Sequence, residues 1–305
     1  MRAIRYDTYG GPEVLQQVEV EVPTPKPDEV LVAVRFAAVN PFDLKLRSGA
    51  MEGMVKVAFP VTPGSEIAGV VTALGAEVAD SAELAVGDEV FGWATSGGYA
   101  EFATAAVVAR RPQGLREEIA AALPVAGEAA LRGLRLLGLS AGETLLVHGA
   151  AGAVGSLAVQ LAVARGVTVI GTCSEKDAEA VRELGAHPVR YGDGVFERVR
   201  ELAPEGVDAV LDAAGAGDLP GSIDLVGGTE RVITLADPAA YGLGVTFSSG
   251  GRRDQTPDAL RQLADAALSG ALVLPPARHL PLAEAAEAHR LVAAGGQRGK
   301  VLLDT

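Results

Sequence analysis

A glycine-rich turn between an apolar strand and an alanine-rich helix constrains this chain more than any other feature of its sequence. Residues 145–148 form a short apolar run, and an apolar helical run over 154–164 follows the turn. A strand, a tight turn and a helix in this order expose backbone N–H groups at a helix N-terminus, where a pyrophosphate binds without a side-chain charge. Gly152 would let the backbone approach the phosphate, and Gly155 would let the helix pack close to the strand. We therefore expect a dinucleotide to contact the turn residues Gly149, Ala150, Gly152, Ala153, Val154 and Gly155.

The turn by itself leaves an ordinary β-α connection as an alternative. Ala150 stands where the G-x-G-x-x-G pattern has its first glycine, so the fingerprint is incomplete. Hydropathy alone would suggest a membrane-spanning helix, because the run approaches the roughly 20 residues that a bilayer requires. We reject that interpretation because the glycines of the turn would break a lipid-exposed helix.

The hydrophobic pattern changes along the chain and predicts two kinds of domain. A β-dominated part is expected first, with strands at 29–38, 66–74, 89–91 and 99–109. Helical patterns follow at 116–123 and 127–137, and strands then alternate with helices. The expected strands lie at 145–148, 167–171, 188–190, 207–212, 231–235 and 244–247, and the expected helices at 154–164, 177–184 and 195–202. This alternation predicts an α/β fold with a doubly wound parallel sheet, because each parallel connection needs a crossover.

The last part of the chain is expected to return to the β-dominated domain. It holds helical patterns at 257–269 and 282–294, an extended piece at 272–280 and a strand at 300–303. A length of 305 residues also favours two domains. We predict one domain from 1–124 with 262–305, and a second from 125–261.

Charge and cysteine content exclude several classes of protein. The net charge of −13 disfavours nucleic acid or an anionic membrane as the main partner, because both require a basic surface. Cys173 is the only cysteine, which excludes a disulfide scaffold and a multi-cysteine zinc lobe. The first residues lack the apolar region of a signal peptide, so a cytoplasmic location is expected.

The end of the second strand of the parallel sheet predicts which nicotinamide cofactor is bound. A site specific for NAD(H) places an Asp or Glu there to accept hydrogen bonds from the ribose 2′-OH. This chain has no acid at Gly171 or Thr172, and Gly171 would leave room. Thr172, Ser174 and Lys176 supply hydroxyls and a cation that suit a 2′-phosphate. We expect NADP(H) rather than NAD(H), with Glu175 pointing away.

Ordered motifs along the whole chain resemble one known family. They occupy residues 38–45 (AVNPFDLK), 63–69 (PGSEIAG), 87–92 (GDEVFG), 98–101 (GYAE), 123–127 (LPVAG), 149–155, 184–186 (LGA) and 298–301 (RGKV). In these motifs the chain resembles the zinc-independent, ζ-crystallin-like quinone oxidoreductases of the medium-chain dehydrogenase/reductase superfamily. The resemblance implies a GroES-like β domain that carries most of the substrate site and a Rossmann domain, with NADPH bound between them. It also implies a homodimer joined through the Rossmann sheet.

The resemblance also implies roles for individual residues. Zinc alcohol dehydrogenases of this fold carry a catalytic Cys and His where this chain has Asn40 and Ser65, so no metal is expected. Asn40 and Lys45 are the candidate catalytic residues, since an amide could hold a ribose or a carbonyl and an ammonium could bind a substrate oxygen. A turn-forming Asn40 and a solvated Lys45 are the structural alternatives. Further cofactor contacts are expected from Ala130, Tyr191, Ala213, Leu235, Ala236 and Lys300, and substrate contacts from Tyr241, Phe247 and Ser248.

The chain departs from the family pattern at several of these positions. Lys45 and Met51 stand where bacterial quinone reductases carry tyrosines, which puts a shared substrate preference in doubt. Ala129 stands where relatives have a threonine close to the nicotinamide amide, so another group would have to hold that amide.

The expected activity is reduction of a quinone or an α,β-unsaturated carbonyl compound with NADPH. Such acceptors are already electrophilic, so hydride transfer to them needs less help from a metal than alcohol oxidation does. Two alternatives stay open: a stand-alone polyketide-type enoyl reductase, and a crystallin-like protein that binds NADPH and RNA without catalysis. The acidic net charge disfavours RNA.

Overall fold

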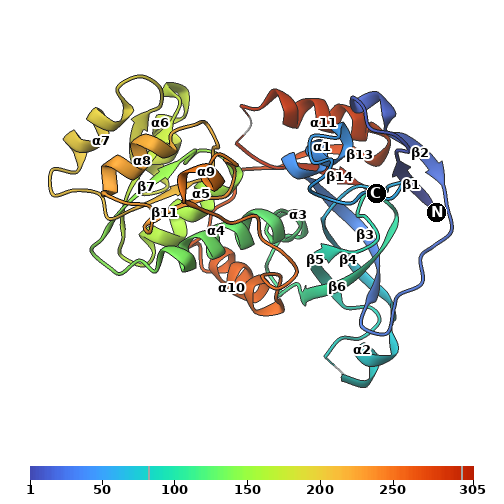
Figure 1. Ribbon diagram of the computed structural model, residues 1–305. Helices are drawn as coiled ribbons and strands as arrows, with labels where there is room; N and C mark the ends of the chain where they lie inside the picture. Colours follow the sequence, from blue (N-terminus) through green and yellow to red (C-terminus); the bar gives the residue numbers. More distant parts are fainter. Residues whose placement is uncertain (82, 297) are drawn as a thin grey trace. The chain divides into compact units, whose positions relative to one another are not determined.

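The structure is a computed structural model that describes residues 1–81, 83–296 and 298–305, and its chain divides into two compact units (Figure 1). Unit 1 comprises Met1–Val125, Gln255–Leu268 and Leu274–Thr305, and unit 2 comprises Ala126–Asp254 and Ser269–Val273. The domain boundaries expected from the sequence stay a prediction. The expected boundary at 261/262 falls inside helix α10 (Pro257–Leu268), which belongs to unit 1 as a whole.

Unit 1 is built around a six-stranded sheet that partly closes on itself. Antiparallel pairing runs from β3 (Val30–Val39) through β4 (Glu66–Leu74) and β5 (Glu89–Ala94) to β6 (Phe102–Arg110), and β6 pairs back onto β3. Irregularities in the register between Leu31 and Val32 and between Val34 and Phe36 accompany this double pairing of β3. Such irregularities bend a strand and let a sheet curve.

The C-terminal segment adds to this sheet in unit 1. Strand β14 (Val301–Asp304) pairs antiparallel with β3, and β13 (Arg278–Pro281) pairs parallel with β14. A separate two-stranded sheet joins β1 (Arg2–Arg5) to β2 (Gln16–Glu19). The helical elements of unit 1 are η1 (Pro12–Val14), α1 (Pro41–Ser48), α2 (Ala76–Ser81), α3 (Glu117–Ala122), α10, η3 (Leu282–Glu284) and α11 (Ala285–Ala294).

Unit 2 is a six-stranded parallel sheet with the order β12-β11-β10-β7-β8-β9. The strands are β7 (Thr144–His148), β8 (Thr168–Cys173), β9 (His187–Arg190), β10 (Ala209–Asp212), β11 (Val232–Thr234) and β12 (Thr246–Phe247). The helical elements are α4 (Pro124–Leu137, which starts in unit 1), α5 (Ala153–Val163), η2 (Glu175–Asp177), α6 (Ala178–Glu183), α7 (Val195–Leu202), α8 (Leu219–Val226) and α9 (Ala240–Leu243). The strand order reverses between β7 and β10, so the predicted doubly wound parallel sheet is confirmed.

Burial explains why β7 lies at the centre of this sheet. Leu145, Leu146 and Val147 are fully buried, so both faces of the strand are covered. A strand buried on both faces reads as a continuous apolar run, which is the pattern that the sequence shows here. Helix α5 contacts β7 and β8, and α8 contacts β10 and β11.

A buried glutamine holds the segment 269–273 against the rest of unit 2. Gln160 of α5 is only 7% exposed, and its Nε2 donates to the carbonyl oxygen of Val273 at 3.2 Å. Its Oε1 accepts a hydrogen bond from the backbone N–H of Val273 at 2.7 Å. The side chain therefore satisfies a donor and an acceptor of the backbone where the chain leaves unit 2.

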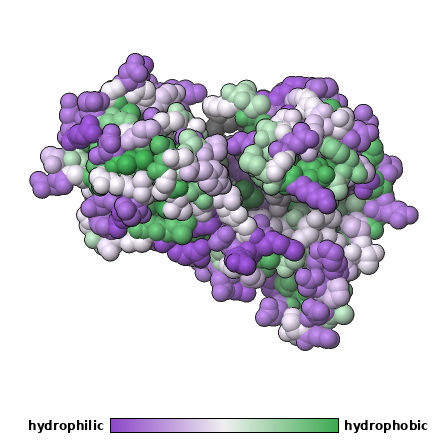
Figure 2. All heavy atoms as spheres, viewed as in Figure 1, coloured by the Kyte–Doolittle hydropathy of each residue, from purple (hydrophilic) through white to green (hydrophobic). Residues whose placement is uncertain are grey.

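None of the helices among the described residues is long and apolar enough to span a membrane. Figure 2 shows one face of the molecule, on which hydrophobic residues form small groups separated by hydrophilic ones.

Candidate functional site

The glycine-rich turn follows β7 directly, as the sequence predicts. Gly149 adopts a left-handed backbone conformation, with φ of 76°, that favours glycine. A Cβ atom added to Gly155 would lie 2.1 Å from the carbonyl oxygen of Gly149. Gly155 is therefore required for the close approach of α5 to the end of β7.

Several amides of the turn are used to hold its own shape. The N–H of Gly149 donates to Oγ1 of Thr172 at 3.1 Å, and the N–H of Ala150 donates to the carbonyl oxygen of Thr172 at 3.0 Å. The N–H of Gly152 donates to the carbonyl oxygen of Gly149 at 2.9 Å. The expected cofactor contacts of Gly149, Ala150 and Gly152 stay predictions, and their N–H groups already have partners.

The first turn of α5 carries the amides that are open to an anion. Among the described residues, none accepts a hydrogen bond from the N–H groups of Ala153, Val154 or Gly155. The first N–H groups of a helix lack intrahelical partners and carry its positive partial charge. This part of the turn can therefore bind a phosphate through backbone atoms alone.

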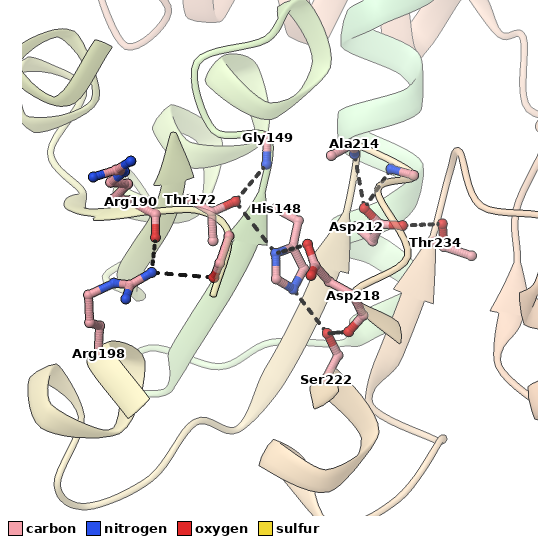
Figure 3. Close-up of polar contacts among 12 residues, drawn as sticks. His148, Gly149, Thr172, Arg190, Arg198, Asp212, Ala214, Asp218, Ser222 and Thr234 are labelled. Atoms are coloured by element: carbon pink, nitrogen blue, oxygen red, sulfur yellow. Dashed lines mark hydrogen bonds and ion pairs between the residues drawn. The ribbon is translucent and has the colours of Figure 1, made fainter. Parts of the chain in front are cut away.

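The ends of β10 and β11, at Asp212 and Thr234, lie at the same edge of the sheet as His148 at the end of β7 (Figure 3). Asp212 ends β10 opposite His148, and its Oδ1 accepts hydrogen bonds from the N–H groups of Ala214 at 2.9 Å and Gly215 at 3.0 Å. Its Oδ2 accepts a hydrogen bond from Thr234 Oγ1 at 2.7 Å. This buried carboxylate fixes the loops that carry the expected cofactor residues Ala213, Leu235 and Ala236.

The end of β8 differs in detail from what the sequence suggests. A Cβ on Gly171 would lie 2.5 Å from Cβ of Ala150, so the space beside Gly171 is filled by the turn. Thr172 is 2% exposed, and its hydroxyl contacts the turn. Ser174 donates a hydrogen bond from Oγ to Oδ2 of Asp177 at 2.6 Å. The sequence could not reveal these partners, so contacts of Thr172 and Ser174 with a 2′-phosphate stay predictions.

Lys176 and Tyr191 remain accessible at this end of the sheet. Lys176 lies in η2 and is exposed, and Tyr191 is 56% exposed. The backbone N–H of Tyr191 donates to the carbonyl oxygen of Cys173, which joins the ends of β9 and β8. Arg198 of α7 donates to the carbonyl oxygen of Arg190 at 2.7 Å (Figure 3). It also donates to that of Asp193 at 2.9 Å, and so fixes the loop that carries Tyr191.

The expected substrate residues in unit 2 fall into two groups. The rings of Tyr241 and Phe247 lie 5.3 Å apart, and Tyr241 is 75% exposed. The carbonyl oxygen of Ser248 instead accepts a hydrogen bond from Nη1 of Arg132 at 2.6 Å, and its hydroxyl contacts the same nitrogen. The expected cofactor residue Ala130 is fully buried on α4. Contacts of Tyr241, Phe247, Ser248 and Ala130 with a ligand stay predictions.

Sequence reasoning missed a buried ion pair on α4. Arg132 Nε lies 2.8 Å from Oε1 of Glu128, and both side chains are nearly buried. Burial raises the pKa of the Glu128 carboxyl, and the hydrogen bond from Arg132 opposes that shift. The spacing of an acid four residues before a base on a helix was the available signal.

Unit 1 joins two of the predicted residues in a buried network. Asn40 donates a hydrogen bond from Nδ2 to Oε1 of Glu66 at 2.9 Å. Nζ of Lys300 lies 2.5 Å from both Oδ1 of Asn40 and Oε1 of Glu66, and Glu66 is fully buried. The second Glu66 oxygen accepts the N–H of Val125 at 2.7 Å. Lys45 is not in this network, because it lies exposed on α1.

Asp43 forms a second buried group beside this network. Its carboxylate accepts the N–H of Asn40 at 2.8 Å, the hydroxyl of Tyr99 at 3.2 Å and the hydroxyl of Ser65 at 3.4 Å. Burial raises the pKa of Asp43 to about 6 against the effect of these hydrogen bonds. Nε2 of His289 lies 3.3 Å from the Tyr99 hydroxyl, and burial lowers the pKa of His289 to about 3.

The raised pKa of Asp43 predicts how the stability of unit 1 depends on pH. The folded state keeps a proton that the unfolded chain has released, so this carboxyl lowers the free energy of unfolding as pH rises. We expect a loss of about 3 kcal/mol from this group between about pH 4 and about pH 6. Denaturation followed by fluorescence of Trp93, the single tryptophan and part of β5, measures it.

Asp43→Asn is the matched variant for this prediction, because it cannot ionise. The free energy of unfolding of the variant, relative to that of the wild type, should therefore rise by about 3 kcal/mol from about pH 4 to about pH 6. A difference that does not change with pH would contradict the assignment.

The described residues offer no zinc site. No group of three or more His, Cys, Asp or Glu side chains in the described ranges could hold a metal ion, and the single cysteine, Cys173, is buried in β8. Asn40 and Ser65 are neutral side chains engaged with Glu66 and Asp43. The residues present therefore do not fit a catalytic zinc ion.

Comparisons with known proteins agree with this geometry. A zinc-binding dehydrogenase family model matches residues 184–303, and an alcohol dehydrogenase GroES-like domain model matches 26–112. Quinone oxidoreductase of Mus musculus is 35% identical, covering 99% of this chain and 97% of that protein. The structure of Escherichia coli quinone oxidoreductase complexed with NADPH aligns with a TM-score of 0.88, 25% identity and 100% coverage of both chains. A mycobacterial protein complexed with NADPH aligns with a TM-score of 0.87, 30% identity and 100% coverage of both chains.

Proposed function

The chain belongs to the quinone oxidoreductases of the medium-chain dehydrogenase/reductase superfamily, and on that premise we propose that it is an NADPH-dependent reductase of quinones or α,β-unsaturated carbonyl compounds. Relatives named quinone oxidoreductase that match nearly its whole length favour this activity over the enoyl reductase and crystallin-like alternatives. NADPH, when bound, supplies the hydride. The protein must bind the cofactor and the acceptor, orient them and polarise the acceptor.

One observation carries the proposal: the turn after β7 lies at the point where the strand order reverses, with its helix amides open. Ligands of open α/β sheets bind at such a point, beyond the carboxyl ends of the strands. The N–H groups of Ala153, Val154 and Gly155 have no partner among the described residues and fit a diphosphate. The residues present therefore fit the cofactor.

The other side chains have proposed roles that follow from their chemistry. Lys176, with Ser174 and Tyr191, would bind the 2′-phosphate, while the buried Thr172 holds the turn. Ala213, Leu235 and Ala236 would line the dinucleotide. In unit 1, Asn40 and Lys300 would hold a ribose or a carbonyl oxygen. Lys45 would donate to a substrate oxygen that gains charge, which is the role that an oxyanion donor needs. Tyr241, Phe247 and Ser248 would border the substrate, and Ala130 the cofactor.

Oxidation of NADPH, followed by the absorbance of its reduced nicotinamide, tests the proposal. Acceptors should include quinones, 2-alkenals and a crotonyl thioester. Turnover with quinones or 2-alkenals is expected. Turnover with none of these acceptors would contradict the proposed activity, and turnover with the thioester alone would favour the enoyl reductase.

Lys176→Ala should weaken NADPH binding more than NADH binding. A charge-assisted contact with the 2′-phosphate is lost for NADPH only, so its KM should rise about tenfold while that of NADH changes little. Steady-state kinetics with both cofactors measures this. Arg200→Ala, which removes an exposed charge from α7 of the same unit, is the control. Equal losses for both cofactors would contradict the contact.

We further propose a homodimer joined through the sheet of unit 2, and a cytoplasmic location. No described strand pairs with the outer edge of β12, which leaves that edge available for a second copy. Sedimentation analysis of the purified chain tests the dimer, and a monomer at micromolar concentration would contradict it.

A further inference from the structure

We propose that His148 is a positioning residue whose hydrogen bonds set the affinity of the turn for NADPH. The inference rests on the proposed function in one respect, namely that the turn after β7 holds the diphosphate. It adds a buried histidine that contacts no ligand and acts through Thr172 and Gly149.

His148 ends β7 directly below the turn and is 1% exposed (Figure 3). Its Nε2 lies 2.9 Å from Oγ of Ser222 on α8, and its Nδ1 lies 3.5 Å from Oγ1 of Thr172 on β8. The ring of Phe196 packs against it edge-on, with the centroids 6.1 Å apart. One imidazole therefore joins three elements of unit 2.

The hydrogen positions follow from the partners. The Ser222 hydroxyl donates its proton to the carbonyl oxygen of Asp218 at 2.8 Å, so it must accept from His148. Nε2 of His148 then carries the proton, and Nδ1 is left as an acceptor. The nearest oxygen to Nδ1 among its described partners is Oγ1 of Thr172 at 3.5 Å, since Oδ2 of Asp218 lies 3.8 Å away, beyond hydrogen-bond distance. The pKa of His148 is lowered by burial, with Asp212 and Asp218 opposing the shift, which agrees with a neutral ring.

The bare Nδ1 makes Thr172 the link to the turn. The Thr172 hydroxyl has one proton, which it donates to Nδ1, and its oxygen accepts the N–H of Gly149. Hydrogen bonds thus run in one direction from Gly149 through Thr172, His148 and Ser222 to the Asp218 carbonyl. Gly149 also defines the approach of α5 through its carbonyl oxygen, which contacts Gly152 and lies close to Gly155. Fixing Gly149 therefore fixes where the open amides of α5 point.

Loss of these connected hydrogen bonds should affect the affinity for the cofactor rather than the rate of hydride transfer. A turn that is no longer held in place must be ordered by the cofactor itself, which weakens binding. Once the cofactor is saturating, the bound geometry is the same and kcat should be preserved. A histidine that served packing alone would lower stability and leave the KM for NADPH unchanged.

The test is a double-mutant cycle on His148 and Thr172, read out as KM for NADPH, kcat and direct NADPH binding. We expect His148→Leu and Thr172→Val each to raise KM about tenfold with kcat within about twofold, and the double variant to be no worse than either single variant. His148→Asn keeps an acceptor near the Nδ1 position and should recover part of the affinity. Val210→Ala, a cavity in the fully buried β10, is the control for destabilisation without a change in KM.

The outcomes separate this inference from the proposed function. Wild-type protein that does not bind NADPH would overturn the function itself. Wild-type protein that binds NADPH, with His148→Leu equal to it in KM or with additive effects of the two substitutions, would overturn the role of His148 alone.

Discussion

Gly155→Ala is expected to abolish NADPH-dependent turnover and to lower the free energy of unfolding of unit 2 by about 3 kcal/mol. The added Cβ would lie 2.1 Å from the carbonyl oxygen of Gly149, 2.8 Å from its carbonyl carbon and 3.0 Å from Cα of Ala150. All of these are backbone atoms, so no side chain can rotate to relieve the contact. Helix α5 must move away from β7, and its open amides move with it.

Gly152→Ala is the matched control for this prediction. Its φ of −75° suits alanine, and the added Cβ meets only the Gly149 carbonyl oxygen, at 3.2 Å. The fold should therefore persist, while the methyl group stands at the exposed side of the turn where a phosphate would approach. We expect near-wild-type thermal unfolding with a raised KM for NADPH. If Gly155→Ala instead kept wild-type stability and turnover, the close approach of α5 to the Gly149 carbonyl would be contradicted.

Local backbone requirements explain why the parallel sheet could be predicted from the sequence. Apolar strands buried on both faces and the glycine-rich turn are contiguous in the chain, so their pattern is complete without tertiary knowledge. The helices α1, α2, α8 and α9 were not expected from the sequence, although α1 and α8 carry signals that were available. Asn40 caps α1 with Pro41 and Asp43 behind it, and Gly227 ends α8 with a positive φ. Both helices are short, with eight residues each.

The direction of polar side chains could not be predicted in the same way. The hydroxyls of Thr172, Ser174 and Ser248 were expected to face ligands, and in the structure each has a protein partner. Those partners lie on other elements or in the first turn of a following helix. Tertiary packing decides whether they come within hydrogen-bond distance, so the local sequence does not show them. The pair of Asn40 and Lys300 is separated by 260 positions in the sequence, so only the pairing of β14 with β3 brings the two together.

Lys300→Met is expected to lower the free energy of unfolding of unit 1 by about 3–5 kcal/mol. Glu66 is fully buried, and the lysine side chain that neutralises it is only 9% exposed. Methionine fills much of the same volume but leaves the carboxylate without a positive partner, so the cost is that of an uncompensated buried charge rather than of lost packing. Denaturation followed by the fluorescence of Trp93, which is buried in β5 of the same unit, reports the loss.

The double variant Lys300→Met/Glu66→Gln distinguishes this explanation from a simple loss of contacts. Glutamine removes the buried negative charge, keeps an oxygen to accept from Asn40 or Val125, and should restore a large part of the stability that Lys300→Met loses. Lys45→Met makes the same change on the exposed face of α1 and should stay within about 0.5 kcal/mol of wild type. If Lys300→Met costs no more than Lys45→Met, or if the glutamine makes the loss greater, then Lys300 does not neutralise Glu66. Lys300 would then lack the preorganised ammonium group that its proposed role in holding the ribose or the carbonyl requires.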